Sequence, residues 1–139
     1  MVGQRQPAGR QPRHHLTLLD LDFAHHSDPG KMRDHNEDSL GHCQPATAEE
    51  GRSHGWLFAL ADGLGGHEKG EVASAAAIDR LLSAFHDAPP DEPPAQLLAR
   101  VMREANAHVY ELAQGSGMAT TLVACVLRHD RIAVGHAGD

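Results

Sequence analysis

The sequence predicts an α+β fold in which helices lie on one face of a largely antiparallel sheet. Strand-like apolar runs come first, two segments with helical periodicity follow, and two further strand-like runs end the 139 residues. Strands that follow one another across short turns pair most readily as antiparallel neighbours. A chain of this length is enough for one domain with a buried core.

The N-terminal third contains a polar lead-in and two candidate strands. Residues 1–15 are basic, are broken by prolines and lack the apolar core of a signal peptide. We expect them to be a disordered lead-in to a domain that spans residues 16–139. Within that domain, the alternation in residues 16–24 predicts a first strand, and residues 38–43 predict a short second one. Residues 44–55 are polar and are expected to form a loop.

The middle of the chain begins with a third candidate strand. Residues 56–61 (WLFALA) are continuously apolar, which indicates a strand covered on both faces. The glycine-rich residues 62–66 (DGLGG) follow, and we expect them to form a turn outside any regular element.

Two helices and two strands complete the prediction. The first helix starts near Glu68 and ends before Pro89-Pro90, with apolar residues at helical spacing at Ile78, Leu81, Leu82 and Phe85. The second helix begins at Pro93-Pro94, ends before Gly115, and repeats the helical period at Leu97, Leu98, Val101, Met102, Ala105, Val109 and Leu112. Residues 118–127 and 131–136 are then strands joined by a two-residue turn at His129-Asp130.

Composition excludes several classes of protein. Nineteen acidic and 12 basic residues give a net charge of −7, which argues against a protein that binds nucleic acid through its phosphates. No apolar run is long enough to cross a membrane. Two distant cysteines do not make a disulfide scaffold and fit a reducing compartment, so with no export signal we expect the cytoplasm. The 12 histidines are scattered, without a metal-binding spacing.

Carboxylates cluster where the chain turns. Glu37-Asp38, Asp62 and Asp139 each lie beside the end of a predicted strand. The glycines after Asp62 allow the backbone to approach a ligand closely, and carboxylate and carbonyl oxygens suit Mg²⁺ or Mn²⁺. Taken singly, Asp62-Gly63 also fits an ordinary turn, and Glu37-Asp38 also fits a solvated surface. Arg33 suits a phosphate, or a surface ion pair with a neighbouring acid.

Four segments together are more specific than any one of them. Residues 33–39 (RDHNEDS), 61–74 (ADGLGGHEKGEVAS), 117–122 (GMATTL) and 137–139 (AGD) occur in the order and approximate spacing of one family. The chain resembles the metal-dependent protein phosphatases, the PPM or type 2C group, in their bacterial form. The resemblance runs from about residue 18 to Asp139 and covers the N-terminal half of the family's domain.

The resemblance implies a fold and a set of ligands. The family forms a four-layer α-β-β-α sandwich with antiparallel sheets, and two Mn²⁺ or Mg²⁺ ions bind at one end. By motif position, Asp62 bridges both ions, the carbonyl of Gly63 binds one, and Glu37 contributes to the second with Asp38 close by. Asp139 matches an acid that can bind a third ion.

The resemblance also implies the chemistry. Arg33 holds the substrate phosphate, and a water activated by the metals attacks phosphorus, so that no covalent phosphoenzyme forms. The family hydrolyses phosphoserine and phosphothreonine in proteins, the products of serine/threonine kinases, with no nucleic acid or membrane involved. Leu64 stands where some members carry a histidine that protonates the leaving group, and the threonines of residues 117–122 are expected to pack near the site without catalysing.

Other functions are open to the same sequence. The family's C-terminal half supplies further metal-binding aspartates, and these are absent here. The alternative is a truncated, inactive remnant that acts as a metal- or partner-binding module. A phosphatase of the kind that acts on anti-sigma-factor antagonists shares the sheet core but has a less complete Arg…Glu-Asp motif.

Overall fold

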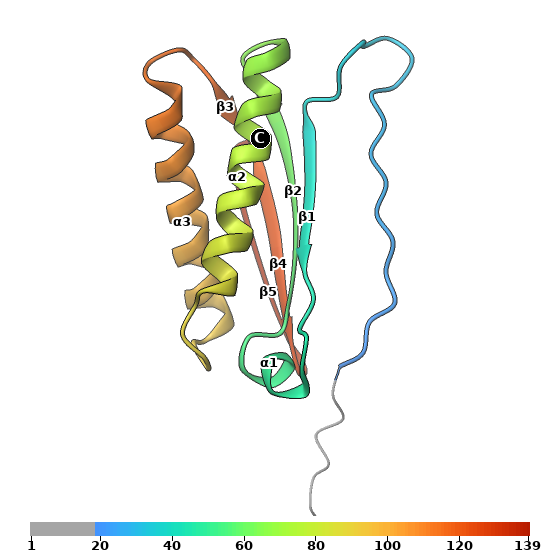
Figure 1. Ribbon diagram of the computed structural model, residues 1–139, viewed down its shortest axis with the longest axis vertical. Coiled ribbons are helices and arrows are strands. Elements are labelled where there is room, and N and C mark those ends of the chain that lie inside the picture. The colour runs from blue at the N-terminus through green and yellow to red at the C-terminus, as the bar shows by residue number, and fades with distance from the viewer. Residues whose placement is uncertain (1–18) are drawn as a thin grey trace, which may run out of the picture.

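The computed structural model describes residues 19–139, apart from the side chain of His67 (Figure 1). The expected lead-in, residues 1–15, lies outside the described residues, and so do residues 16–18. Along the chain the elements are β1 (Asp38–Cys43), α1 (Ala48–Ser53), β2 (Trp56–Leu64), α2 (His67–His86), α3 (Pro94–Ala113), β3 (Ala119–Thr120), β4 (Leu122–Arg128) and β5 (Arg131–Ala137). None of these helices is long and apolar enough to cross a membrane.

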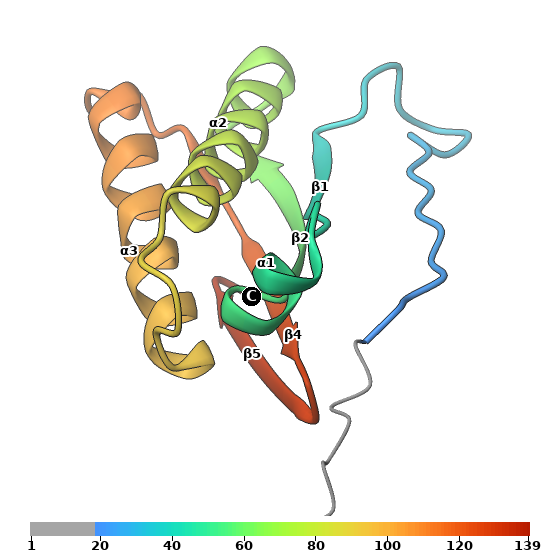
Figure 2. The ribbon, with the colours of Figure 1, turned by 60° about the horizontal axis from the view of Figure 1, so that its bottom comes forward.

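One antiparallel sheet organises the described residues. Its strand order is β1-β2-β4-β5, and the short β3 pairs with the end of β2. Both long helices run along one face of this sheet, as Figure 2 shows. The predicted α+β class with helices on an antiparallel sheet is therefore confirmed, as are the boundaries of β1 and, within a residue or two, those of both long helices.

The core lies between the helices and the sheet. Alternate residues of β2 and β4 point to the helices because side chains alternate along a strand. The predicted apolar stripes of α2 and α3 cover them, except that Leu112 at the end of α3 is 46% exposed. The fully buried aliphatic side chains of this core are Leu57, Leu81, Leu97, Val101 and Val126.

The other face of the sheet is largely open within the described residues. Leu60 and Val123 lie on it with 41% and 40% of their surface exposed, and Val134 is 68% exposed. A groove of about 270 Å³ runs across this face. On the face away from the helices, Trp56 is only 3% exposed, whereas Leu60 is 41% exposed. The prediction that residues 56–61 are covered on both faces therefore holds at Trp56 and fails at Leu60.

The predicted first strand does not form in residues 19–24. This segment is extended but forms no ladder with a strand (Figure 1). The indole N–H of Trp56 on β2 donates a hydrogen bond to the Leu19 carbonyl at 3.4 Å. Aromatic packing also holds the segment. Phe23 contacts the rings of His42 and Phe58 edge-on, with centroids 4.7 and 4.9 Å away, on the open face.

The predicted loop at residues 44–55 contains the short helix α1. Thr47 caps it by accepting a hydrogen bond from the Glu50 main-chain N–H at 3.1 Å, and the Glu50 carboxylate accepts one in return from Ala46 N–H at 2.7 Å. The sequence has the Thr-x-x-Glu signature of a capping box, but the Glu50 carboxylate binds the N–H of Ala46, one residue before the cap.

Two further boundaries differ from the prediction. β2 continues through Asp62, Gly63 and Leu64, which we expected to be a turn, because β1 and β3 pair with these residues. The predicted single strand over residues 118–127 is divided at Thr121 into β3 and β4. Both differences occur where β2 stops pairing with β4 and begins to pair with β3. By contrast, the predicted turn at His129-Asp130 is confirmed.

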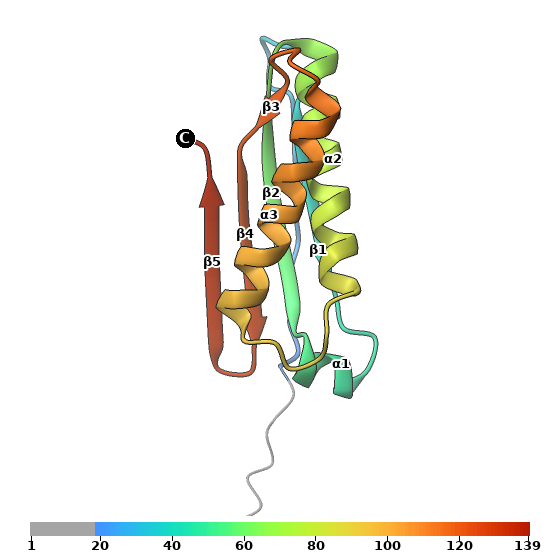
Figure 3. The same ribbon diagram turned by 90° about the vertical axis from the view of Figure 1, so that its left-hand side faces the viewer.

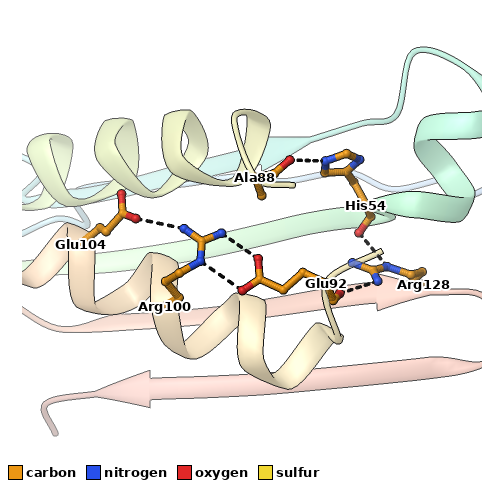
Figure 4. Close-up of polar contacts among 6 residues, drawn as sticks. All are labelled: His54, Ala88, Glu92, Arg100, Glu104 and Arg128. Atoms are coloured by element: carbon orange, nitrogen blue, oxygen red, sulfur yellow. Dashed lines mark hydrogen bonds and ion pairs between the residues drawn. The ribbon is translucent and has the colours of Figure 1, made fainter. Parts of the chain in front are cut away.

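A polar network joins the elements at the end of the sheet where α1 lies (Figure 4). Arg128, only 7% exposed, donates from Nε to the carbonyl of His54 at 3.2 Å and from Nη1 to the carbonyl of Glu92 at 2.6 Å. The Glu92 carboxylate accepts two hydrogen bonds from Arg100, at 2.8 and 3.1 Å. The network thus links the loop between α2 and α3 to β4 and to the start of β2.

This bidentate ion pair predicts a pH-dependent contribution to stability. Hydrogen bonding to Arg100 lowers the pKa of Glu92, so its contribution is present above its ordinary pKa of 4.5 and is lost as the pH falls through the lowered value. We expect Glu92→Gln to lower the free energy of unfolding at neutral pH by about 1–3 kcal/mol. The difference in free energy of unfolding between the parent and Glu92→Gln should become smaller at acid pH. Thermal unfolding at several pH values measures this. The exposed Glu111→Gln, on the helix that carries Arg100, is the control, and equal effects of both variants contradict the prediction.

Candidate functional site

The predicted site residues gather at the end of the sheet opposite α1. β1 begins there, β2 ends there, and α2 starts there after a short turn (Figure 1). β3 lies at the same end, and β5 runs back toward it, as Figure 3 shows. Elements that are far apart in the sequence therefore bring Glu37, Asp38, Asp62, Gly63 and Asp139 to one end of the fold.

Two carboxylates face each other across the first ladder. Asp38 and Asp62 are directly paired residues of β1 and β2, so their side chains project from the same face of the sheet. This is the open face, because the residues two positions away, Leu40 and Leu60, also lie on it. Burial raises the pKa of Asp38, and repulsion from Asp62 together with a hydrogen bond to its side chain raises it further. The pair thus concentrates negative charge that a cation would neutralise.

Glu37 lies on the other side of the strand end. Its main-chain carbonyl accepts a hydrogen bond from the Gly63 N–H at 3.1 Å. Its carboxylate packs against the α-carbon of Gly70, in the first turns of α2, where a side chain would collide with Oε2. Adjacent residues of an extended chain point to opposite sides, as expected from the sequence. Glu37 therefore contacts the helix while Asp38 faces Asp62.

Close approach of two glycines sets the position of the α2 start. A Cβ on Gly63 would collide with the main chain of Gly70, so the end of β2 and the first turns of α2 meet backbone to backbone. Lys69, beside Gly70, donates from Nζ to the carbonyl of Ser116 at 3.2 Å and so ties α2 to the loop before β3. The end of β2 and the start of α2 are therefore packed against each other and do not form a free turn.

Arg33 stands in the exposed loop before β1. Its positive charge lowers the pKa of Asp38, in opposition to the causes that raise it. Asn36 holds the loop by accepting a hydrogen bond from Asp38 N–H at 3.0 Å and donating one to the Ser27 hydroxyl at 2.7 Å. The loop that carries Arg33 therefore leads directly into the carboxylate pair.

Asp139 follows β5 at the same end. Gly138, just before it, packs on Thr121, with the position of its missing Cβ 3.1 Å from Cγ2 of that threonine. Thr121 in turn hydrogen-bonds to the main chain of Asp62. Asp139 is therefore connected to the carboxylate pair through Gly138 and Thr121, and its own side chain is exposed.

The donor set fits a divalent cation in part. Carboxylates and a glycine carbonyl are ligands that Mg²⁺ and Mn²⁺ prefer, and burial together with repulsion from Asp62 raises the pKa of Asp38. Within residues 19–139, however, no three His, Cys, Asp or Glu side chains converge closely enough to hold a metal. The described residues supply a pair of carboxylates and need further ligands to make a complete site.

Two contributors were not apparent as site residues from the sequence. Gly70 shapes the site by admitting both Glu37 and Gly63, but a lone glycine in a helix carries no signal of what packs against it. The threonines of residues 117–122 lie near the site as expected, and they also hydrogen-bond directly to the Asp62 main chain. Leu64 is 52% exposed at the strand end.

The carboxylate pair predicts a variant that stabilises the metal-free protein. Because the pKa of Asp38 is raised in the folded state, its contribution to stability is present in acid and is lost as the pH rises through that value. We expect Asp38→Asn to unfold at a higher temperature than the parent at neutral pH in the presence of a chelator, with the difference vanishing near about pH 3. The exposed Asp79→Asn on α2 is the control. A lower unfolding temperature for Asp38→Asn would contradict the repulsion.

The contact between Gly63 and Gly70 predicts which of two alanine substitutions destabilises the protein more. Gly63→Ala places a Cβ against the main chain of Gly70, whereas Gly70→Ala places one chiefly against the flexible Glu37 carboxylate. We expect Gly63→Ala to lose more free energy of unfolding than Gly70→Ala, by about 1 kcal/mol or more, because backbone yields less than a side-chain end. Chemical denaturation measures both. The reverse order would show that the two segments are not packed as described.

Known proteins with similar sequences are bacterial phosphatases. The serine/threonine protein phosphatase PstP of Mycobacterium tuberculosis is 35% identical over 131 residues, which cover 89% of this chain and 22% of that protein. The serine/threonine phosphatase stp of Listeria monocytogenes is 30% identical over 120 residues, 81% of this chain and 45% of that protein. A solved structure of the PstP catalytic domain in complex with two manganese ions superposes with a TM-score of 0.62 at 35% identity, covering 82% of this chain and 46% of that one.

The family and the extent of the match are both clear. The chain spans less than half the length of these relatives, so the sheet and its two helices correspond to one part of a larger α-β-β-α domain. The open face of the sheet is the one on which the second sheet of such a sandwich lies. The family model for protein phosphatase 2C matches residues 33–139, from Arg33 to Asp139. On this evidence the chain belongs to the protein phosphatase 2C family.

Proposed function

We propose that the protein is a metal-dependent phosphatase that hydrolyses phosphoserine and phosphothreonine in proteins. The observation that carries the proposal is the carboxylate pair of Asp38 and Asp62, which share one face at the end of the sheet. Arg33 lies in the loop that leads into this pair. A cation-binding pair of acids and a guanidinium suit the hydrolysis of a phosphate monoester. The similarity to phosphatases, one of them in complex with two manganese ions, supports the same chemistry.

In this proposal each residue has a defined role. Asp62 and the carbonyl of Gly63 would hold one cation, and Asp62 and Glu37 would hold a second, with Asp38 close by. Arg33 binds the oxygens of the substrate phosphate and orients it. When bound, two Mn²⁺ or Mg²⁺ ions make a water acidic enough to attack phosphorus and neutralise charge on the phosphate oxygens. Asp139 is placed to serve a further ion from the end of β5.

The substrates we propose are proteins phosphorylated by serine/threonine kinases, and the place of action is the cytoplasm. The names of the relatives support the first part, since they are described as serine/threonine phosphatases. The acidic net charge supports a role apart from nucleic acid. We further propose that residues 16–139 act as one unit of the phosphatase domain, after a lead-in of residues 1–15.

A second candidate has one observation in its favour. Within residues 19–139 no three ligand side chains converge on a metal position, so this part of the domain on its own fits a weak metal-binding or partner-binding module. The two candidates differ in catalysis, and activity distinguishes them. We expect the 139-residue chain by itself to show little or no turnover.

The central prediction concerns Asp62. For the protein purified from its own cells at its natural length, we expect Mn²⁺-dependent release of phosphate from a phosphothreonine peptide. Asp62→Asn should reduce that rate by roughly 100-fold or more, because the residue serves both cations. A phosphate-release assay with and without a chelator measures it.

The matched control is Asp79→Asn, which removes an exposed carboxylate from α2 and should keep the parental rate. Phosphate release that persists in chelator, or that survives in Asp62→Asn, would overturn the proposed mechanism. No release by the natural-length protein with any divalent cation would favour the binding module instead.

A further inference from the structure

The main chain of Asp62 is held by two threonines from a distant part of the sequence. Its N–H donates to Oγ1 of Thr121 at 3.1 Å. Its carbonyl accepts from the Thr121 N–H at 2.9 Å and from the Thr120 hydroxyl at 3.1 Å. Both main-chain polar groups of the residue proposed to bridge the metals are therefore bonded to one dipeptide.

These contacts replace the regular ladder where it is interrupted. β2 pairs with β4 as far as Leu60 opposite Val123, and with β3 from Gly63 opposite Thr120 onward. Thr121 belongs to neither strand. A side-chain hydroxyl thus takes the place of a strand carbonyl as the acceptor for Asp62 N–H, and this makes the position of Asp62 depend on the identity of residue 121.

Thr121 has a second contact through its methyl group. Gly138 packs against it, with its missing Cβ position 3.1 Å from Thr121 Cγ2 and 3.3 Å from Thr121 Cα. Gly138 immediately precedes Asp139, and its φ of 86° is in the left-handed region that suits glycine. One half-buried side chain therefore contacts Asp62 with its hydroxyl and the Gly138-Asp139 segment with its methyl.

We propose that Thr121 is a positioning residue that sets the placement of Asp62 relative to Asp139 and thereby the affinity of the site for its metal ions. The metal in this inference depends on the proposed function. The geometry depends only on the hydrogen bonds described above. The two halves of the side chain have separable tasks. The hydroxyl orients the Asp62 main chain, and the methyl supports the turn that carries Asp139.

Two substitutions separate these tasks. Thr121→Val keeps the branched shape and removes the hydroxyl, whereas Thr121→Ser keeps the hydroxyl and removes the methyl. We expect Thr121→Val to weaken Mn²⁺ binding by about 10- to 100-fold, as loss of a group that orients a ligand usually does. The affinity should be largely restored in Thr121→Ser, and the KM for a phosphopeptide should stay unchanged in both.

Thr47→Val is the matched control. It too removes a threonine hydroxyl that accepts from a main-chain N–H, that of Glu50 at 3.1 Å, but at the opposite end of the fold. It should lower stability without changing Mn²⁺ affinity. If Thr47→Val and Thr121→Val weaken Mn²⁺ binding equally, the effect is general loss of stability and the positioning role is overturned.

The measurements are Mn²⁺ binding by titration calorimetry and amide hydrogen exchange at Asp62 without metal. Faster exchange at Asp62 in Thr121→Val, beside parental exchange in Thr121→Ser, tests the hydrogen bond without any catalysis. Parental exchange and parental Mn²⁺ affinity in Thr121→Val would overturn the inference. Failure of the phosphatase proposal is recognised separately, by phosphate release that does not depend on Asp62.

Discussion

The pairing of the start of β1 with the end of β2 is the constraint on which the site depends. Antiparallel register places Asp38 opposite Asp62 and sends both side chains to the face away from the helices. A shift of one residue would turn Asp62 toward the core and expose the buried Ala61. The buried alternation of β2, from Leu57 to Gly63, therefore secures the position of the carboxylates as well as the core.

The repulsion between the Asp38 and Asp62 carboxylates is unfavourable, and packing around their main chains offsets it. Gly63 and Gly70 allow the end of β2 to lie against the first turns of α2, and the threonine hydroxyls hold Asp62 from the other side. Neither contact involves the carboxylates. These contacts fix the main chain of the site, while burial and the charge of Asp62 raise the pKa of Asp38.

The polar network around Arg128 and the proposed metal site lie at opposite ends of the fold. The hydrogen bonds of Arg128 and the Glu92–Arg100 ion pair join the helices to the sheet at the end near α1, far along the strands from Asp62 (Figure 4). The open sheet face connects the two ends and carries apolar side chains such as Leu60 and Val123. The chain spans less than half the length of the relatives it matches, and an exposed apolar face of this kind is typical of a surface that another element covers.

The sequence by itself predicted the two long helices, the strand β1 and the membership of the carboxylates in one set of motifs, because helical periodicity and turn residues are local signals. Only the tertiary structure decided that Asp62 and Gly63 belong to a strand, since their pairing partners, Asp38 and Thr120, lie far from them in the sequence. The same holds for the roles of Gly70 and Thr121, which come from contacts and not from residue type. Residues 19–24 form no strand for the converse reason, because an apolar pattern becomes a strand only where a hydrogen-bonding neighbour is present.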